Sequence, residues 1–200
     1  IIQRREAMIA SHGPLVVYTG KCTGRSAKDK FFVEEPSSRE NIWWQANETF
    51  GQAQFEALKQ RILTYYSQTE LYIQDCYGGA DPMYRFPVRI VTDTAWSSLF
   101  TYNMFRHARI DSPQEFEPDF TLLVASGFEA EPEIDGTRSD VVIAIDLGQR
   151  QAIIAGTRYG GEIKKTVFTV LNYLFPLMDV LPMHCSANIG VNGDTALFFG

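Results

Sequence analysis

Residues 141–175 read VVIAIDLGQRQAIIAGTRYGGEIKKTVFTVLNYLF, and this stretch decides the fold class. Its two apolar runs, 141–147 and 151–156, are separated by a short turn around Gly148, a pattern that predicts two antiparallel strands joined as a hairpin. From Gly161 onward, apolar residues recur at helical spacing until a proline follows, which predicts a helix. Two strands followed by a helix indicate an α/β protein.

The rest of the chain alternates in the same way. Helical spacing predicts a helix at residues 52–67 and another at 94–105, whose packed side we expect to contain Trp96, Leu99, Phe100 and Asn103. Short β-prone runs predict strands at residues 15–18, 31–33, 71–76, 86–91, 120–124, 181–185 and 195–199. Because a hairpin is inserted among alternating strands and helices, we expect a three-layer α/β domain with a mixed β-sheet.

Composition and charge exclude several classes of protein. Of the 200 residues, 45% are hydrophobic and 21% are charged, as in ordinary folded proteins. No apolar run approaches the roughly 18 residues that a membrane span needs, and residues 1–6 lack the layout of a signal peptide. The net charge of -6 provides no overall attraction for nucleic acid. We therefore expect neither a membrane nor a nucleic-acid partner.

The three cysteines are an odd number without C-x-x-C spacing. This usage argues against a disulfide framework and against a structural zinc site. A reducing, cytoplasmic location fits it best.

A loop rich in glycine and basic residues, YTGKCTGRSAKDK at 18–30, separates the first two of these predicted strands. As a phosphate-binding P-loop it is a near miss, because Gly20 and Gly24 enclose three residues and Arg25 stands where the motif requires lysine. The planar guanidinium of Arg25 would instead suit the two oxygens of a carboxylate. From the residues alone, a solvated basic loop is an equal alternative.

A second basic motif, RYGGEIKK at 158–165, stands at the start of the helix predicted from Gly161. Lys164 and Lys165 lie at the end of a helix where the macrodipole is already positive, which is unfavourable for cations. An exposed pair would cost only a few tenths of a kcal/mol to about 1 kcal/mol each, so a surface role is possible. Free N–H groups, flexible glycines and two ammonium groups would alternatively form an anion site, with Tyr159 at its side.

A third motif, LPMHCSAN at 181–188, places His184 on an apolar run before a polar turn. A histidine in this setting is either a hydrogen-bonded core residue or a metal ligand. The residues alone leave both alternatives open.

The three motifs resemble those of ATP-dependent phosphoenolpyruvate carboxykinases. The matching runs are TGRSxKDKF from Thr23, YxGExKK from Tyr159, and MHCSANxG from Met183 followed by GDxALFFG. The resemblance continues through 42–44, Asp75, 102–105 and 171–174, and so covers nearly the whole chain. One departure is Ala27, where the family usually has proline; this change affects backbone stiffness and removes no functional side chain.

The resemblance implies a reaction and a set of site residues. The family converts oxaloacetate and ATP to phosphoenolpyruvate, carbon dioxide and ADP in gluconeogenesis. By resemblance, Arg25 contacts the substrate carboxylate, while Tyr159 and the Gly161 amide position the substrate. Lys165 also contacts substrate and, as a neutral amine, binds manganese together with His184. His184 further contacts the nucleotide phosphates, Lys164 aids phosphoryl transfer, and magnesium is an alternative metal.

The resemblance also implies which part of the family's enzyme this chain corresponds to. We expect residues 1–179 to form the N-terminal, substrate-side domain and residues 180–200 to begin a C-terminal nucleotide-binding domain, stopping before its phosphate loop. A chain of this extent would be inactive without the remainder of the enzyme. Two other functions stay open: a P-loop-like kinase or NTPase that uses the loop of Arg25, and a non-catalytic α/β domain that binds anions.

Overall fold

A computed structural model describes residues 1–108 and 116–199. Gly200, which ends the run GDxALFFG that follows the third motif, lies outside the described residues. The chain forms two compact units, Ile1–Val167 and Phe168–Gly200, with the boundary inside helix α4 (Gly161–Leu174). No helix among the described residues combines the length and the apolar character needed to cross a membrane.

The first unit is built on one eight-stranded sheet with the order β4-β3-β9-β10-β8-β6-β5-β7. Its central hairpin, β9 (Val142–Asp146) and β10 (Gln151–Ala155), is antiparallel, whereas β8 pairs in parallel with both β10 and β6. The predicted hairpin and mixed sheet are therefore confirmed. The other strands are β3 (Lys30–Val33), β4 (Glu48–Phe50), β5 (Tyr72–Gly78), β6 (Phe86–Thr92), β7 (Arg106–His107) and β8 (Phe120–Ala125).

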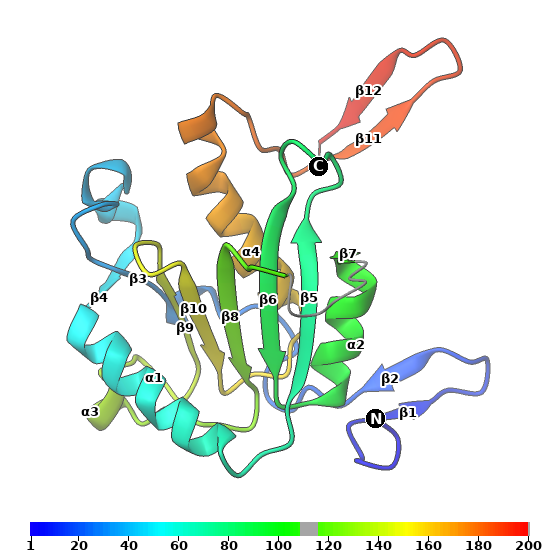
Figure 1. The fold of residues 1–200 in the computed structure, drawn as a ribbon. Helices are drawn as coiled ribbons and strands as arrows, with labels where there is room; N and C mark the ends of the chain where they lie inside the picture. The colour runs from blue at the N-terminus through cyan, green and yellow to red at the C-terminus, as the bar shows by residue number, and fades with distance from the viewer. Residues whose placement is uncertain (109–115, 200) are drawn as a thin grey trace. The chain divides into compact units, whose positions relative to one another are not determined.

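Helix α1 (Gln52–Tyr66) covers one face of this sheet, and the short α3 (Pro132–Asp135) lies beside it (Figure 1). Four apolar side chains of α1, spaced at three or four residues, are buried in a cluster with strand residues: Phe55, Leu58, Ile62 and Tyr66. Burying a large apolar side chain contributes roughly 1.5–3 kcal/mol, so this stripe anchors the helix. The helix predicted at 52–67 is confirmed.

The opposite face carries α2 (Ala95–Met104) and the start of α4. Helix α2 contacts β5 and β6, and the glycine before α4 lies against the Phe100 ring of α2. Helices on both faces of a sheet make the predicted three-layer α/β architecture. The predicted packed side of α2 is wrong for Leu99 and Asn103, which are exposed. Small polar residues pack instead, namely Ser97, Ser98 and Thr101.

The strand predicted at 15–18 is confirmed as β2 (Leu15–Val17), but it does not join the main sheet. In the part of the chain that the structure describes, it pairs with β1 (Ala7–Ile9) in a separate two-stranded antiparallel ribbon. Three short 3-10 turns complete the described part of this unit: η1 (Ala27–Asp29), η2 (Arg39–Asn41) and η3 (Trp44–Ala46).

The second unit contains the end of α4, the turn η5 (Pro176–Met178) and the antiparallel hairpin of β11 (Ser186–Ile189) and β12 (Thr195–Phe198). The strand predicted at 195–199 is confirmed, whereas the strand predicted at 181–185 is wrong because pairing begins only at Ser186. Pro182 explains the difference, since proline has no N–H to donate to a ladder.

Candidate functional site

The loop that carries Arg25 connects β2 with β3. The chain turns at Gly20, whose φ of 67° lies in the left-handed region that favours glycine. After Arg25 the chain makes the single turn η1 and passes directly into β3. A P-loop leads from a strand into an α-helix, so this loop lacks the architecture that a P-loop kinase or NTPase would need.

The start of α4 packs very closely against α2. A Cβ added at Gly160 would lie 2.7 Å from the Phe100 ring, and a Cβ at Gly161 would lie 2.4 Å from the Tyr159 ring. The indole N–H of Trp96 donates to the Arg158 carbonyl at 3.1 Å. The two glycines therefore permit a close approach that fixes the first turn of α4, and the Tyr159 ring lies beside Gly161.

Glu162, in that first turn, joins α4 to the Arg25 loop. The backbone N–H of Ser26 donates to Oε1 of Glu162 at 2.6 Å, across 136 positions of sequence. The Glu162 side chain is buried, with 5% of the residue exposed. This part-buried hydrogen bond ties two of the basic motifs together.

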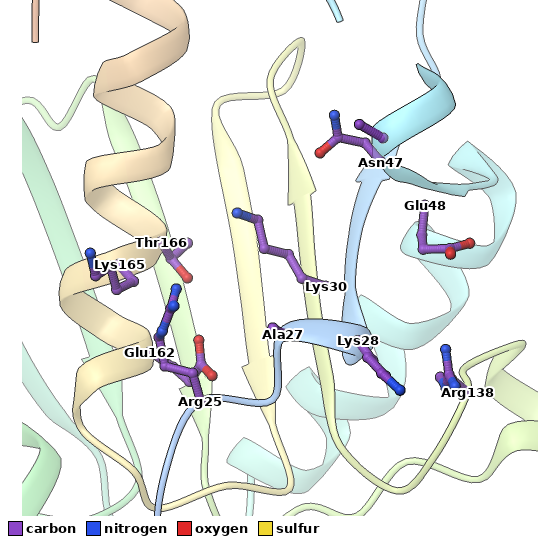
Figure 2. Close-up of a pocket in the computed structure, with 11 residues that line it drawn as sticks. Arg25, Ala27, Lys28, Lys30, Asn47, Glu48, Arg138, Glu162, Lys165 and Thr166 are labelled. Carbon is purple, nitrogen blue, oxygen red and sulfur yellow. The ribbon is translucent and has the colours of Figure 1, made fainter. Parts of the chain in front are cut away.

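The two motifs line a single pocket of about 490 Å³ (Figure 2). Five cationic and two acidic residues contribute to its wall, together with four others: Arg25, Lys28, Lys30, Arg138, Lys165, Glu48, Glu162, Ala27, Ala46, Asn47 and Thr166. In Figure 2, Lys30 stands between the α4 side of the pocket and the side formed by Lys28, Arg138 and Glu48. The excess of cations suits the pocket to an anionic ligand.

The charges in this pocket influence one another. The pKa of Lys165 is lowered by desolvation, by Lys164 and by Arg25. Burial lowers the pKa of Lys30, and Arg25 and Lys165 lower it further, while Glu162 opposes this shift. An anion entering the pocket would offset the repulsion among these cations, so its binding is electrostatically favourable.

The acid at the centre of these cations is Glu162. Burial raises the pKa of its carboxyl group, whereas the Ser26 hydrogen bond and the charges of Arg25 and Lys30 lower it. The neighbouring cations therefore stabilise the ionised form against the cost of burial.

The structure brings together two of the predicted site residues, Arg25 and Lys165, in the wall of one pocket. Three more, Tyr159, Gly161 and Lys164, lie within a few residues of Lys165 but do not line it. His184 belongs to the second unit, where its exposed side chain contacts the Phe168 ring with the centroids 5.5 Å apart.

Several residues of the pocket were not predicted as site residues. Lys28 and Lys30 belong to the basic loop, and Glu162 to the second motif, so proximity in sequence was a signal for all three. Arg138 and Asn47 come from separate loops and carry no such signal.

Lys21, although in the same basic loop, faces elsewhere. It pairs with Asp140 and lies 3.7 Å from Glu129, beside a smaller pocket of about 280 Å³. Its charge is therefore balanced locally, and Arg25 alone of these two cations reaches the larger pocket.

Within residues 1–108 and 116–199, acidic, histidine and cysteine side chains do not cluster into a metal site. Among the described residues, no group of three or more of these side chains could hold a metal ion. The donors that the motifs offer are Lys165 and His184. The lowered pKa of Lys165 is the direction that a metal-binding amine requires, because only the neutral amine has a lone pair to donate.

Comparison with known proteins agrees with the motifs. The family model for phosphoenolpyruvate carboxykinase matches residues 1–200. The chain is 51% identical to phosphoenolpyruvate carboxykinase (ATP) of Thermus thermophilus over 202 residues, which covers 98% of this chain and 38% of that protein. The enzymes of the same name from Caldanaerobacter subterraneus and Pelobacter propionicus are 47% and 46% identical, and the matches cover 100% of this chain and 38% of each. The chain thus spans about 38% of the length of these relatives, and it belongs to the ATP-dependent phosphoenolpyruvate carboxykinase family.

Proposed function

We propose that this chain forms the substrate-binding part of an enzyme that converts oxaloacetate and ATP to phosphoenolpyruvate, carbon dioxide and ADP. The observation that supports this most is the meeting of Arg25 and Lys165, 140 positions apart in sequence, at one cationic pocket. We infer the reaction from family membership. The cations of the pocket could bind the two carboxylates of oxaloacetate.

Decarboxylation of oxaloacetate leaves an enolate, whose oxygen then accepts a phosphoryl group from ATP. Negative charge develops on that oxygen, and preorganised cations stabilise such charge more effectively than water does. In our proposal Arg25 binds a substrate carboxylate, Tyr159 and the Gly161 amide orient the substrate, and Lys164 assists phosphoryl transfer.

The same proposal assigns Lys165 and His184 as ligands of a divalent metal, manganese or magnesium. When bound, the metal would supply Lewis-acid stabilisation of the developing charge. Lys165 fits this role because desolvation, Lys164 and Arg25 all lower its pKa and so favour its neutral form. His184 fits it because its ring is exposed within the second unit and imidazole is a common ligand of transition metals.

We further propose that residues 180–200 begin a nucleotide-binding domain, in which His184 would contact the ATP phosphates. Most of the ATP site would then belong to the remainder of the enzyme. The reducing location suggested by the cysteines is cytoplasmic, which suits three thiols that are free in the described structure.

The test is Arg25→Ala in the full-length enzyme. Loss of a charged hydrogen bond costs about 1.5–3 kcal/mol, so we expect oxaloacetate binding to weaken roughly 10- to 100-fold. Arg25→Lys should recover only part of this, because lysine lacks the planar fork. Arg85→Ala is the matched control, since Arg85 is exposed, lies over the Tyr77 ring at 4.4 Å and is outside the pocket. An unchanged Michaelis constant and turnover in Arg25→Ala would reject the role.

A further inference from the structure

Glu162 is an acid placed among cations that the substrate would also use. It is one of only two acidic residues in the wall of the larger pocket, as far as the described residues show, and the other, Glu48, is exposed. Its carboxylate accepts the Ser26 N–H at 2.6 Å, and the residue as a whole is 5% exposed. A buried carboxylate within a pocket for anions repels the ligand, so its presence needs a compensating role.

The geometry of the Ser26 hydrogen bond indicates that role. Ser26 directly follows Arg25, in a loop whose next residues form only the three-residue turn η1. Glu162 occupies the first turn of α4, three residues before Lys165, and that turn is fixed by the packing of Gly160 on Phe100. The first turn of α4 thus holds the loop through the Glu162 side chain.

We propose that Glu162 is a positioning residue, whose carboxylate holds the Arg25 loop against the first turn of α4 so that Arg25 and Lys165 face the same pocket. The inference rests on the proposed function, because it concerns how the oxaloacetate-binding cations are arranged. Charge contributes as well as geometry, since the ionised carboxylate attracts both Arg25 and Lys30. Glu162 itself does not contact the substrate in this proposal.

A second buried glutamate provides a matched control. Glu6 is 8% exposed and accepts backbone N–H groups at the start of α2, from Trp96 at 2.7 Å and Ala95 at 3.3 Å. It therefore makes the same kind of contact as Glu162 in the same unit, but it does not line the pocket. A merely structural role for Glu162 would make the two residues respond alike.

The experiment measures kinetics and thermal unfolding of the full-length enzyme carrying Glu162→Ala, Glu162→Gln or Glu6→Ala. We expect Glu162→Ala to raise the Michaelis constant for oxaloacetate on the order of tenfold, because the Ser26 N–H loses its partner. Glu162→Gln keeps an acceptor oxygen and should recover part of the affinity; it also keeps the test valid if the alanine variant folds poorly. Glu6→Ala should lower the unfolding temperature without changing the Michaelis constant.

A double-mutant cycle with Arg25→Ala separates the inference from the proposed function. If Glu162 acts through Arg25, removing it should have little further effect on oxaloacetate binding once Arg25 is alanine. Full additivity of the two effects, or an unchanged Michaelis constant in both Glu162 variants, would overturn the inference while leaving the Arg25 assignment intact. An unchanged Michaelis constant and turnover in Arg25→Ala would instead overturn the proposed function.

Discussion

Lys165 illustrates how neighbours define the chemistry of a single residue. Desolvation lowers the pKa of its ammonium group most, and Lys164 beside it in the chain and Arg25 in the same pocket lower it further. An isolated exposed lysine has a pKa near 10.4 and is a poor metal ligand at neutral pH. Desolvation and the neighbouring like charges therefore both favour the neutral form of Lys165 that the proposed role requires.

Replacing Lys165 with glutamine in the full-length enzyme should weaken manganese binding. Mutation of a residue that only orients a metal-binding side chain already lowers metal affinity about 10- to 100-fold. Loss of a side chain that binds the metal directly should lower it at least as much. Calorimetric titration with manganese would measure this affinity. Lys59→Gln is a control of the same chemistry on α1, where Lys59 pairs with Glu56 at 2.8 Å. Unaltered manganese affinity in Lys165→Gln would show the ligand assignment to be wrong.

Tyr65 shows the influence of a buried neighbour on stability. Its hydroxyl donates to Asp93 at 3.0 Å, and Asp93 also accepts the N–H groups of Ser126 and Gly127. Burial, followed by the Asp93 charge, raises the pKa of Tyr65 to about 12. The folded protein therefore keeps the Tyr65 proton at pH values where the unfolded chain has lost it.

This proton linkage predicts the direction of a pH dependence. The stabilisation from protonated Tyr65 is complete below about pH 10 and is lost as pH rises towards 12, because the unfolded state then binds fewer protons than the folded state. The free energy of unfolding, measured with denaturant from about pH 9 to about pH 12, should fall as the pH rises. Tyr65→Phe should make that fall less steep, and an equally steep fall in the variant would contradict the assignment.

At the scale of elements, α2 and α4 show how small residues determine packing. The buried side of α2 consists of Ser97, Ser98 and Thr101, with Thr101 donating to the Ser97 carbonyl at 2.9 Å. Such residues satisfy their polar groups locally and let a helix approach its neighbours closely. A prediction based only on large apolar residues therefore misplaces the buried face of α2. It places Leu99 there, although Leu99 is exposed.

Gly160→Ala should therefore destabilise the protein. The new methyl group would lie 2.7 Å from the Phe100 ring and force α2 and α4 apart, at a cost of about 1–3 kcal/mol. The change would appear as a lower midpoint of denaturant unfolding. Gly24→Ala is the control, because a Cβ there meets nothing within 4 Å. Equal midpoints for the two variants would mean that the close contact does not matter.

At the scale of the whole molecule, the pocket in the first unit collects charge from separate parts of the chain. Arg25 comes from the loop before β3, Lys165 from α4 and Arg138 from the segment before β9. The formal charge of the chain is -6, so this positive region is a local arrangement rather than a general property. The donors proposed for metal are likewise divided between the two units.

The 200-residue chain by itself should form no phosphoenolpyruvate from oxaloacetate and ATP, since it spans about 38% of the length of its relatives and our proposal assigns most of the ATP site elsewhere. A coupled assay for phosphoenolpyruvate would test this, with the full-length enzyme as the positive control. Activity of the isolated chain would contradict the proposal, and retention of the chain on ATP resin would indicate a nucleotide site within it.

The local pattern of the chain predicts most of its elements because their periodicity is written in neighbouring residues. The strands at 141–147 and 151–156 and the helix from Gly161 were recognisable for this reason, and their packing then agreed with it. Prediction was wrong at 181–185, where an apolar run contains Pro182 and pairing starts later. The short strands β1, β4 and β7 have two or three residues each, too few to show a period.

The sequence by itself determined the family, the succession of strands and helices, and the motifs that contain Arg25, Lys165 and His184. Only the tertiary structure decided which cations share a pocket. Lys30 reaches it because the register of β3 with β9 pairs Lys30 with Ile143, on the face opposite the α1 cluster. Glu162 reaches Ser26 across 136 positions because the fold places the first turn of α4 beside the Arg25 loop. Sheet register and helix packing bring distant side chains together, and no local pattern encodes those distances.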